Sequence, residues 1–287
     1  MPLVECSRAV RTRGLSAMVT GASAGIGRES ALVLARRGAR VWAVARSADL
    51  LEELASAHRG ITPLVADLTD DGDRAAVVDA AGNLDVLVNN AGIGWLGPVE
   101  EMPAAQVRQL FELNVLALID LTQRVIPGML ERRRGHVVNV ASVASWVAIP
   151  PLTVYSATKF AVQGFSDGLR RELAGRGVSV ATVNPGPVAT HFGPRAQVHD
   201  RPTEALGDGV MTGVPPSMVA RAVLRSVRMA GWPGYATIAV PRVLGFSRLG
   251  AVPGLRWTVD AVALVSRRPE MRRRFGPAPD GGDHRSG

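Results

Sequence analysis

The sequence predicts an α/β fold: a doubly wound parallel sheet of seven strands with helices on both faces, followed by a helical C-terminal extension. Three observations support this prediction. Short valine-rich runs alternate with helix-like segments between residues 15 and 240. The runs are apolar at successive positions, as in strands covered on both faces. A glycine-rich turn joins the first run to the next helix, which is where such folds bind phosphate.

The predicted elements follow one another in strict alternation. Strands are expected at 15–20, 40–45, 62–66, 84–89, 136–141, 178–183 and 236–240, and the clearest helices at 26–37, 104–132 and 153–175. This order favours right-handed crossovers and a parallel sheet. We therefore expect a single domain over residues 1–275, with its core at residues 14–240.

Three segments lie outside that alternation. Residues 191–215 are polar and rich in proline and glycine, so we expect a mobile loop that acts as a lid. Residues 241–275 mix apolar blocks with arginines, and short helices packed on the domain are the simplest interpretation. Residues 276–287 have the composition of a disordered tail.

The net charge of +8 belongs mainly to the last third of the chain. Residues 1–190 hold 19 basic and 18 acidic side chains, whereas residues 191–287 hold 14 and 7. One interpretation is peripheral membrane contact through the basic C-terminal extension. The other is a solvated arginine-rich face. No zinc-finger or RNA-recognition signature is present, so we expect no nucleic-acid partner.

Cysteine usage and hydropathy predict a cytoplasmic protein. The single cysteine, Cys6, excludes an internal disulfide and a cysteine-rich metal site, and we expect no bound metal. The first residues, MPLVECSRAVRTRG, lack the apolar stretch of a signal peptide. No uninterrupted apolar run reaches the ~18 residues of a membrane-spanning helix.

The turn after the first predicted strand has the chemistry of a phosphate site. It reads TGASAGIG over residues 20–27, a GxxxGxG spacing, and a helix follows. Glycines permit a tight turn and let the backbone approach a pyrophosphate at the helix N-terminus. This placement predicts a Rossmann-type dinucleotide-binding domain.

The end of the second predicted strand indicates which dinucleotide binds. A carboxylate there would bind the ribose 2′-hydroxyl of NAD, whereas an arginine suits the 2′-phosphate of NADP. The strand ends in Ala45-Arg46-Ser47, and Asp49 is explained more simply as a helix N-cap. We therefore expect NADP(H) in preference to NAD(H).

Lysine is almost absent from this chain, and the one that remains is Lys159. It follows Tyr155, one of only two tyrosines, by four residues, so the two side chains share one face of a helix. A neighbouring ammonium is expected to lower the pKa of the phenol and make it a proton donor and acceptor. From this spacing alone, the alternative is that Tyr155 and Lys159 are surface residues without a function.

Taken in order, these motifs resemble the short-chain dehydrogenase/reductase family in its short-subunit form, over about residues 14–240. The matches are TGASAGIG at 20–27, Asp67 in ADLT, NNAG at 89–92, Asn114 in LFELNV, Ser142 thirteen residues before Tyr155, Tyr155-x-x-x-Lys159, and Asn184-Pro185-Gly186 with Val188 and Thr190. The matched loops follow predicted strands, at the edge where open α/β sheets bind ligands.

The resemblance implies hydride transfer between a nicotinamide and a carbonyl or secondary alcohol. It assigns Tyr155 as general acid and base, Lys159 as the group that lowers its pKa and binds ribose, Ser142 as hydrogen-bond donor to the substrate oxygen, and Asn114 as holder of a relay water. The implied cofactor-binding residues are Gly21, Ser23, Gly25, Ile26, Gly27, Arg46, Ser47, Asp67, Leu68, Asn90, Ala91, Gly92, Tyr155, Lys159, Pro185, Gly186, Val188 and Thr190.

The family's pocket positions are apolar in this chain and predict a hydrophobic small-molecule substrate. They are Ile93, Trp95, Val143, Trp146, Val147, Pro187, Val188 and Phe192. The alternative is that some of these side chains lie in the core or in an interface. In the family, helices such as 104–132 and 153–175 build dimers and tetramers, so we expect a homo-oligomer.

Other functions remain as alternatives. An epimerase or dehydratase of the extended type shares YxxxK, but it usually has GxxGxxG spacing and a larger C-terminal domain. A non-catalytic dinucleotide sensor usually lacks the tyrosine or the lysine, and this chain retains both. A membrane-peripheral binding protein would rely on the basic extension.

Overall fold

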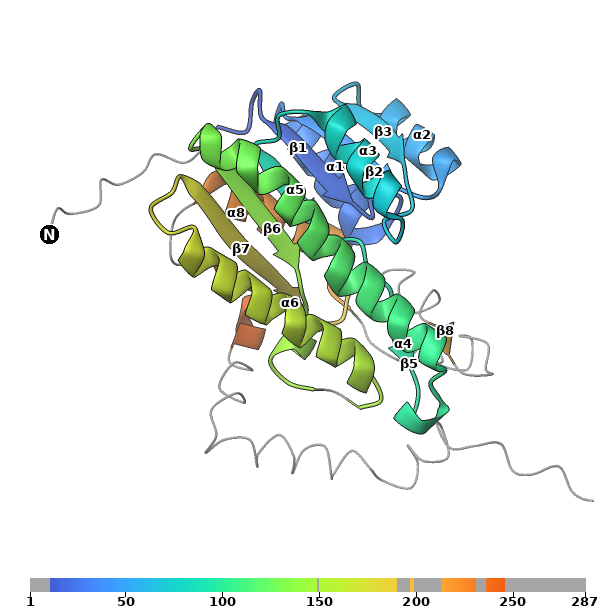
Figure 1. The fold of residues 1–287 in the computed structure, drawn as a ribbon. Coiled ribbons are helices and arrows are strands. Elements are labelled where there is room, and N and C mark those ends of the chain that lie inside the picture. Colours follow the sequence, from blue (N-terminus) through green and yellow to red (C-terminus); the bar gives the residue numbers. More distant parts are fainter. Residues whose placement is uncertain (1–10, 149, 190–196, 199–212, 231–235, 246–287) are drawn as a thin grey trace, which may run out of the picture.

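The computed structural model describes residues 11–148, 150–189, 197–198, 213–230 and 236–245. Its centre is a seven-stranded parallel sheet with the strand order β3-β2-β1-β4-β6-β7-β9 (Figure 1). The strands are β1 Ser16–Thr20, β2 Arg40–Ala45, β3 Ile61–Val65, β4 Val86–Asn89, β6 Gly135–Val140, β7 Val178–Pro185 and β9 Thr237–Val240. The predicted doubly wound α/β fold is confirmed, with strand boundaries that differ from the prediction by at most two residues.

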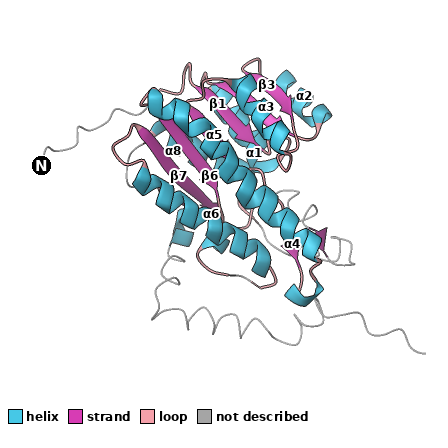
Figure 2. Cartoon of the chain, in the orientation of Figure 1, coloured by secondary structure: helices cyan, strands magenta, loops and turns pink. Residues whose placement is uncertain are grey.

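Helices cover both faces of the sheet (Figure 2). They are α1 Gly25–Arg36, α2 Ala48–Ala57, α3 Asp71–Ala81, α4 Ala104–Phe111, α5 Ala117–Glu131, α6 Thr153–Glu172 and α8 Pro216–Arg228. One core cluster joins β-strand side chains to α1, α2 and α8, and the other joins them to α3, α5 and the end of α6. The alternation of faces explains why the strand sequences are apolar at consecutive positions.

The predicted helix at 104–132 is interrupted. A π-helical segment, Glu112–Leu116, separates α4 from α5 and contains Asn114. Single π-turns inside α-helices occur frequently at functional sites. The whole stretch Ala104–Glu131 is also the one candidate membrane span within the described residues, by length and a mean hydropathy of 1.2. Because 44% of that window is buried against the protein, a core helix accounts for it equally well.

Parts of the predicted lid and extension lie outside the described residues. Of the lid at 191–215, the structure describes residues 197–198 and 213–215, and β8 Gln197–Val198 pairs in parallel with β5 Trp95–Leu96. Val188 and Val214 form a parallel bridge that brings the two ends of this segment together. Residues 246–275 of the predicted helical extension and the predicted disordered tail at 276–287 fall outside the described residues.

Candidate active site

The carboxyl ends of β1, β4, β6 and β7 meet at one edge of the sheet. In the strand order, β2 and β3 lie on one side of β1, while β4, β6, β7 and β9 lie on the other. The strand order therefore switches sides between β1 and β4, although the two strands are parallel, and this switch point is the crevice where such sheets bind ligands. The loops after these strands carry most of the residues singled out from the sequence.

The turn between β1 and α1 depends on glycine at three positions. Gly21 and Gly25 have φ of 66° and 54°, values that favour glycine. At Gly27 a Cβ atom would lie 2.1 Å from the carbonyl oxygen of Gly21, so the turn closes onto the first turn of α1. Ser23 and Ile26 are partly accessible along the same turn.

The N-terminus of α1 is open to an anion. Its N-cap, Ala24, makes no side-chain cap hydrogen bond, and its first turn has no acidic residue. The first amide N–H groups of a helix lack intrahelical acceptors and carry partial positive charge. A pyrophosphate would accept hydrogen bonds from these amide groups, and because Gly27 has no side chain, there is room for it.

Thr20 and Asn90 clamp this turn to the end of β4. The Thr20 hydroxyl accepts from the backbone N–H of Asn90 at 2.9 Å and of Ala91 at 3.0 Å. The Asn90 side chain donates back to the Thr20 carbonyl at 2.9 Å. The Asn90 amide is thus engaged within the protein, and the clamp role of Thr20 was not predicted from the sequence.

Arg46 lies at the end of β2, where the sequence predicts it, and faces Asp67. The Arg46 guanidinium is 3.8 Å from a carboxylate oxygen of Asp67 and is 64% exposed. The other Asp67 oxygen accepts from the backbone and hydroxyl of Thr69. Burial would raise the pKa of Asp67, but the Thr69 hydrogen bonds and the Arg46 charge hold it below its ordinary value.

Two assignments near Arg46 need correction or refinement. The predicted cap role of Asp49 is wrong: Ser47 occupies the N-cap position of α2 and Asp49 lies in its first turn. The Ser47 side chain makes no cap hydrogen bond and is exposed beside Arg46. Leu68 is buried in the core, and its carbonyl accepts from Arg74 at 2.8 Å.

Tyr155 and Lys159 lie together on α6. The Lys159 ammonium is 5.6 Å from the centre of the Tyr155 ring and donates a hydrogen bond to the Val140 carbonyl at 3.1 Å. Lys159 is 6% exposed. A Cβ atom on Gly92 would lie 3.8 Å from the Lys159 nitrogen, so the NNAG turn and α6 meet around the ammonium.

The protonation of this pair differs from the expectation. Burial raises the pKa of Tyr155 to about 12, and a hydrogen bond with Ser142 opposes it. Burial also lowers the pKa of Lys159 to about 8. The expectation that Lys159 lowers the pKa of Tyr155 is therefore wrong for the chain alone. The ammonium lies over the ring, and loss of solvation is the largest effect on the phenol.

Ser142 follows β6 and joins three parts of the site. Its hydroxyl lies 3.5 Å from the Pro185 carbonyl at the end of β7 and accepts from the Ala144 backbone at 3.1 Å. It also shares a hydrogen bond with Tyr155. Ser142 is thus the N-cap of the 3₁₀ turn Val143–Ser145 as well as the neighbour of the phenol.

Asn114 ties the π-helical segment to the loop after β4. Its side chain accepts from the Ile93 N–H and donates to the Ile93 carbonyl, both at 2.9 Å, and donates to the Thr158 hydroxyl at 3.2 Å. It is 1% exposed. The side chain therefore holds Ile93 and α6 in place, and Thr158 joins this contact without having been singled out from the sequence.

The apolar pocket residues divide into buried and accessible groups. Trp95 packs with Met102 and Leu110 in a small cluster that Tyr155 also contacts. Trp146 is 7% exposed, Val143 and Val147 are half-buried, and Pro187 is exposed. Trp95 and Trp146 thus form part of the packed wall, which agrees with the core alternative for those positions.

The motif after β7 packs against the beginning of the extension. At Gly186 a Cβ atom would lie 2.5 Å from a terminal methyl group of Leu244, so a larger residue there would displace the Leu244 side chain. Pro185 is buried and Val188 is half-buried near the same edge. Thr190 and Phe192, also predicted as site residues, lie outside the described residues.

Comparison with known proteins agrees with this geometry. The family described as "short chain dehydrogenase" matches residues 16–199. Dehydrogenase/reductase SDR family member 7B of Mus musculus is 33% identical over 262 residues, covering 87% of this chain and 81% of that protein. The uncharacterized oxidoreductase YbbO of Escherichia coli K12 is 36% identical over 215 residues, covering 72% and 79%.

Solved structures show the same fold. A short-chain dehydrogenase from Streptomyces avermitilis superposes with a TM-score of 0.75 at 31% identity, covering 88% of this chain and 98% of that one. A short chain dehydrogenase from Burkholderia cenocepacia in complex with NADP gives a TM-score of 0.74 at 25% identity, covering 89% and 99%.

Proposed function

Because this chain belongs to the short-chain dehydrogenase/reductase family and is an NAD(P)-dependent oxidoreductase, we propose that it uses NADP(H) and acts on a hydrophobic carbonyl or secondary alcohol. The observation that carries this proposal is the meeting of Ser142, Tyr155 and Lys159 beside the glycine turn of β1. We assign these three side chains and Asn114 as the catalytic group.

The residues present fit a dinucleotide. The uncapped N-terminus of α1 offers amide donors to a pyrophosphate, and the glycines of the turn leave no side chain in its way. When bound, the nicotinamide ring supplies or accepts the hydride. We propose Gly21, Gly25 and Gly27 as pyrophosphate contacts, and Asp67, Ala91, Gly92, Gly186 and Val188 among the other residues along the cofactor.

The preference for NADP(H) rests on Arg46 and Ser47. An exposed guanidinium and a hydroxyl not used for capping lie side by side in sequence at the end of β2. Arginine binds phosphate in a bidentate manner. The Asp67 carboxylate at 3.8 Å holds the guanidinium at this edge and would compete with a phosphate for it. Neighbours of known structure were solved in complex with NADP or with NADH, so a test of the preference has to compare both cofactors.

We propose that Tyr155 donates a proton to the substrate oxygen during reduction and takes it back during oxidation. With a pKa of about 12 the phenol is protonated at neutral pH, which is the form that reduction needs. Ser142, in hydrogen-bond contact with Tyr155, is placed to donate to the same oxygen as negative charge develops. Lys159 and Asn114 hold the surrounding backbone at Val140 and Ile93.

A hydrophobic substrate is supported by the residues around the phenol. Tyr155 contacts a cluster that contains Trp95, Met102 and Leu110, and Ile93 packs against the same cluster. Val143 and Pro187 add accessible apolar surface at the same sheet edge. Backbone pairing of Trp95 with Gln197 brings the predicted lid to this wall, consistent with closure over a substrate.

We further propose a homo-oligomer built on the outer faces of α5 and α6. Leu116, directly before α5, and Phe160, within α6, are large apolar side chains exposed by 51% and 42%. Cytoplasmic location and membrane contact through the basic extension stay predictions, since residues 246–287 lie outside the described residues.

The direct test is a panel of ketones, aldehydes and alcohols followed by NADPH absorbance and repeated with NADH. We expect reduction of apolar aliphatic or polycyclic ketones with NADPH and slower reaction with NADH. Polar sugars and charged acids should react poorly. A higher kcat/KM with NADH would remove the role given to Arg46, and a preference for charged substrates would remove the hydrophobic pocket.

A further inference from the structure

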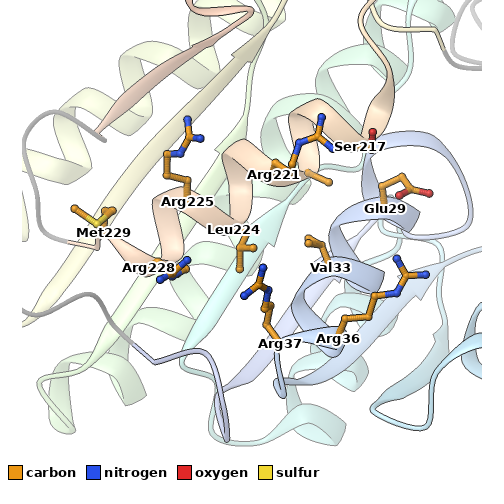
Figure 3. Close-up of a pocket in the computed structure, with 11 residues that line it drawn as sticks. Glu29, Val33, Arg36, Arg37, Ser217, Arg221, Leu224, Arg225, Arg228 and Met229 are labelled. Atoms are coloured by element: carbon orange, nitrogen blue, oxygen red, sulfur yellow. The ribbon is translucent and has the colours of Figure 1, made fainter.

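A second concave site lies between α1 and α8, away from the catalytic group (Figure 3). Its volume is about 570 Å³, and its lining comes from these two helices and the residues that follow each of them. None of the lining residues belongs to the loop that carries Ser142 or to α6, which carries Tyr155. Small-molecule sites usually have volumes of about 300–1,000 Å³.

The groove is lined by an unusual number of cations. Five arginines border it, and all five are exposed: Arg36 at the end of α1, Arg37 directly after it, and Arg221, Arg225 and Arg228 from α8. Glu29 is the one carboxylate in the lining. Within the part of the chain that the structure describes, these arginines form no ion pair, while Glu29 lies 4.0 Å from Arg28 outside the groove.

Helix electrostatics explains only part of this arrangement. Arg36, Arg225 and Arg228 lie in the last turns of their helices, where cations complement the helix dipole. Arg221 lies earlier in α8, and its spacing of four and seven residues from Arg225 and Arg228 places the three on one helix face. The helix dipole accounts for cations at the end of each helix, but it does not account for the cations of α1 and α8 bordering the same groove.

The floor of the groove is apolar. Val33 of α1 and Leu224 of α8 lie between the arginines in Figure 3, with Met229 at one end. In that view Arg37 and Arg228 lie toward one end of the groove, whereas Glu29 and Ser217 lie at the other. An anion would therefore be attracted to the Arg37–Arg228 end, with apolar surface beside it.

We propose that the α1–α8 groove binds an amphiphilic phosphate, meaning a phosphate group joined to an alkyl or acyl chain. Guanidinium groups bind phosphate oxygens through paired hydrogen bonds, which accounts for the arginines at the Arg37–Arg228 end. The alkyl part would cover Val33 and Leu224, which accounts for the apolar floor.

The positive charge of the α1–α8 groove disfavours two other possible occupants. The segment 246–287 of this chain carries eight arginines and four carboxylates, so it would be repelled by the groove. A second copy docked face to face would bring two sets of five arginines together. An anionic amphiphile relieves the repulsion among these cations.

The test is calorimetric titration of the full chain with dodecyl phosphate below its micelle concentration. Inorganic phosphate tests the headgroup alone, and dodecyl maltoside tests the same alkyl chain without the charge. We expect dodecyl phosphate to bind at least about 10-fold more tightly than either, because it alone uses both parts of the groove. Equal binding of dodecyl maltoside would overturn the proposal.

The variant Arg37→Gln/Arg228→Gln should weaken dodecyl phosphate binding at least about 10-fold, because two charged hydrogen-bond donors are lost. The matched control, Arg59→Gln/Arg176→Gln, removes two exposed arginines outside the groove and should change binding less than about 2-fold. Equal loss in both variants would indicate general charge attraction and overturn the site.

Vesicles containing phosphatidic acid identify the source of the phosphate. Loss of co-sedimentation in the groove variant alone would place the phosphate in a lipid headgroup, and retained dodecyl phosphate binding without vesicle binding would indicate a free metabolite. Both results support the site. If neither dodecyl phosphate nor the phosphatidic acid vesicles bound, the proposed site would be refuted. Dehydrogenase activity, measured in parallel, would report separately on the proposed function.

Discussion

The Lys159 ammonium lies 5.6 Å from the centre of the Tyr155 ring and is hydrogen-bonded to the Val140 carbonyl. This contact links the middle of α6 to the end of β6, the strand that leads to Ser142. The lysine thus holds the backbone of the site in place beside the phenol. In the chain alone, burial sets the protonation of both groups.

Replacing Tyr155 by phenylalanine should abolish turnover. The ring stays in its cluster with Trp95 and Leu110, but the proton donor is lost, and general acid–base groups contribute about 10²–10⁴-fold to rate. NADPH binding, measured by fluorescence titration, should change little. Residual activity above a few per cent would show that another group transfers the proton.

Replacing Lys159 by arginine should change the pH profile of reduction. With a pKa of about 8, Lys159 is protonated below that pH and neutral above it, so a reaction that needs the ammonium declines as pH rises through about 8. Arginine stays charged, so any activity that remains should lack this decline. An unchanged profile in the arginine variant would assign the decline to a different group.

Replacing Gly27 by alanine should weaken cofactor binding. The new Cβ would lie 2.1 Å from the Gly21 carbonyl oxygen, so the turn must move. We expect the dissociation constant for NADPH to rise at least about 10-fold, since backbone donors in the turn are displaced. The matched control is Gly164→Ala in α6, where a Cβ meets nothing within 4 Å. That variant should bind NADPH normally and gain up to about 1 kcal/mol of stability. Similar losses in the two variants would contradict the prediction.

Folding stability should fall in mild acid because of His136. This side chain is buried on β6, where Ser179 and Ser226 hydroxyls lie 2.8 and 3.5 Å from its ring nitrogens. Burial lowers the pKa of His136 from 6.5 to about 4, so between these values the unfolded chain binds more protons than the folded one. Its contribution is complete above pH 6.5 and is lost as pH falls toward 4, by about 3 kcal/mol in total.

Urea denaturation at a series of pH values measures this effect. The slope of unfolding free energy against pH between 4 and 6.5 should be smaller in His136→Gln, which cannot titrate. Burial would raise the pKa of Asp120, but hydrogen bonds from Arg124 and Arg74 hold it below its ordinary value. Carboxylates of this kind contribute to the pH dependence at lower pH in both proteins. Identical slopes above pH 5 would rule out His136 as the titrating group.

The sequence was sufficient to predict those features of the fold and the site that depend on local spacing or on the ends of strands. The alternation of apolar runs predicted all seven strands of the main sheet, because strands buried on both faces are mostly apolar at successive positions. Strand ends in a parallel sheet converge on one edge, so the residues after β1, β4, β6 and β7 could be brought to one site from their positions alone.

Other features follow only from the tertiary structure, because they depend on contacts between residues that are distant in sequence. The π-turn at Glu112–Leu116 is not visible in a helical pattern, and neither is the hold of Asn114 on Ile93. The arginines of α1 and α8 are about 190 residues apart in sequence and face one groove only because both helices cover the same side of the sheet. The pKa of Tyr155 was wrongly expected to fall, because sequence spacing locates a cation but not the surrounding burial.

The order of residues by itself determined a doubly wound sheet, a phosphate turn after the first strand and a tyrosine one helical turn from the only lysine. Only the folded chain decided how deeply that pair is buried, which backbone groups hold it and where the arginines of α1 and α8 gather. The reason is physical: periodicity and turn chemistry act over a few residues, whereas solvation and charge depend on everything that packs around a group in space.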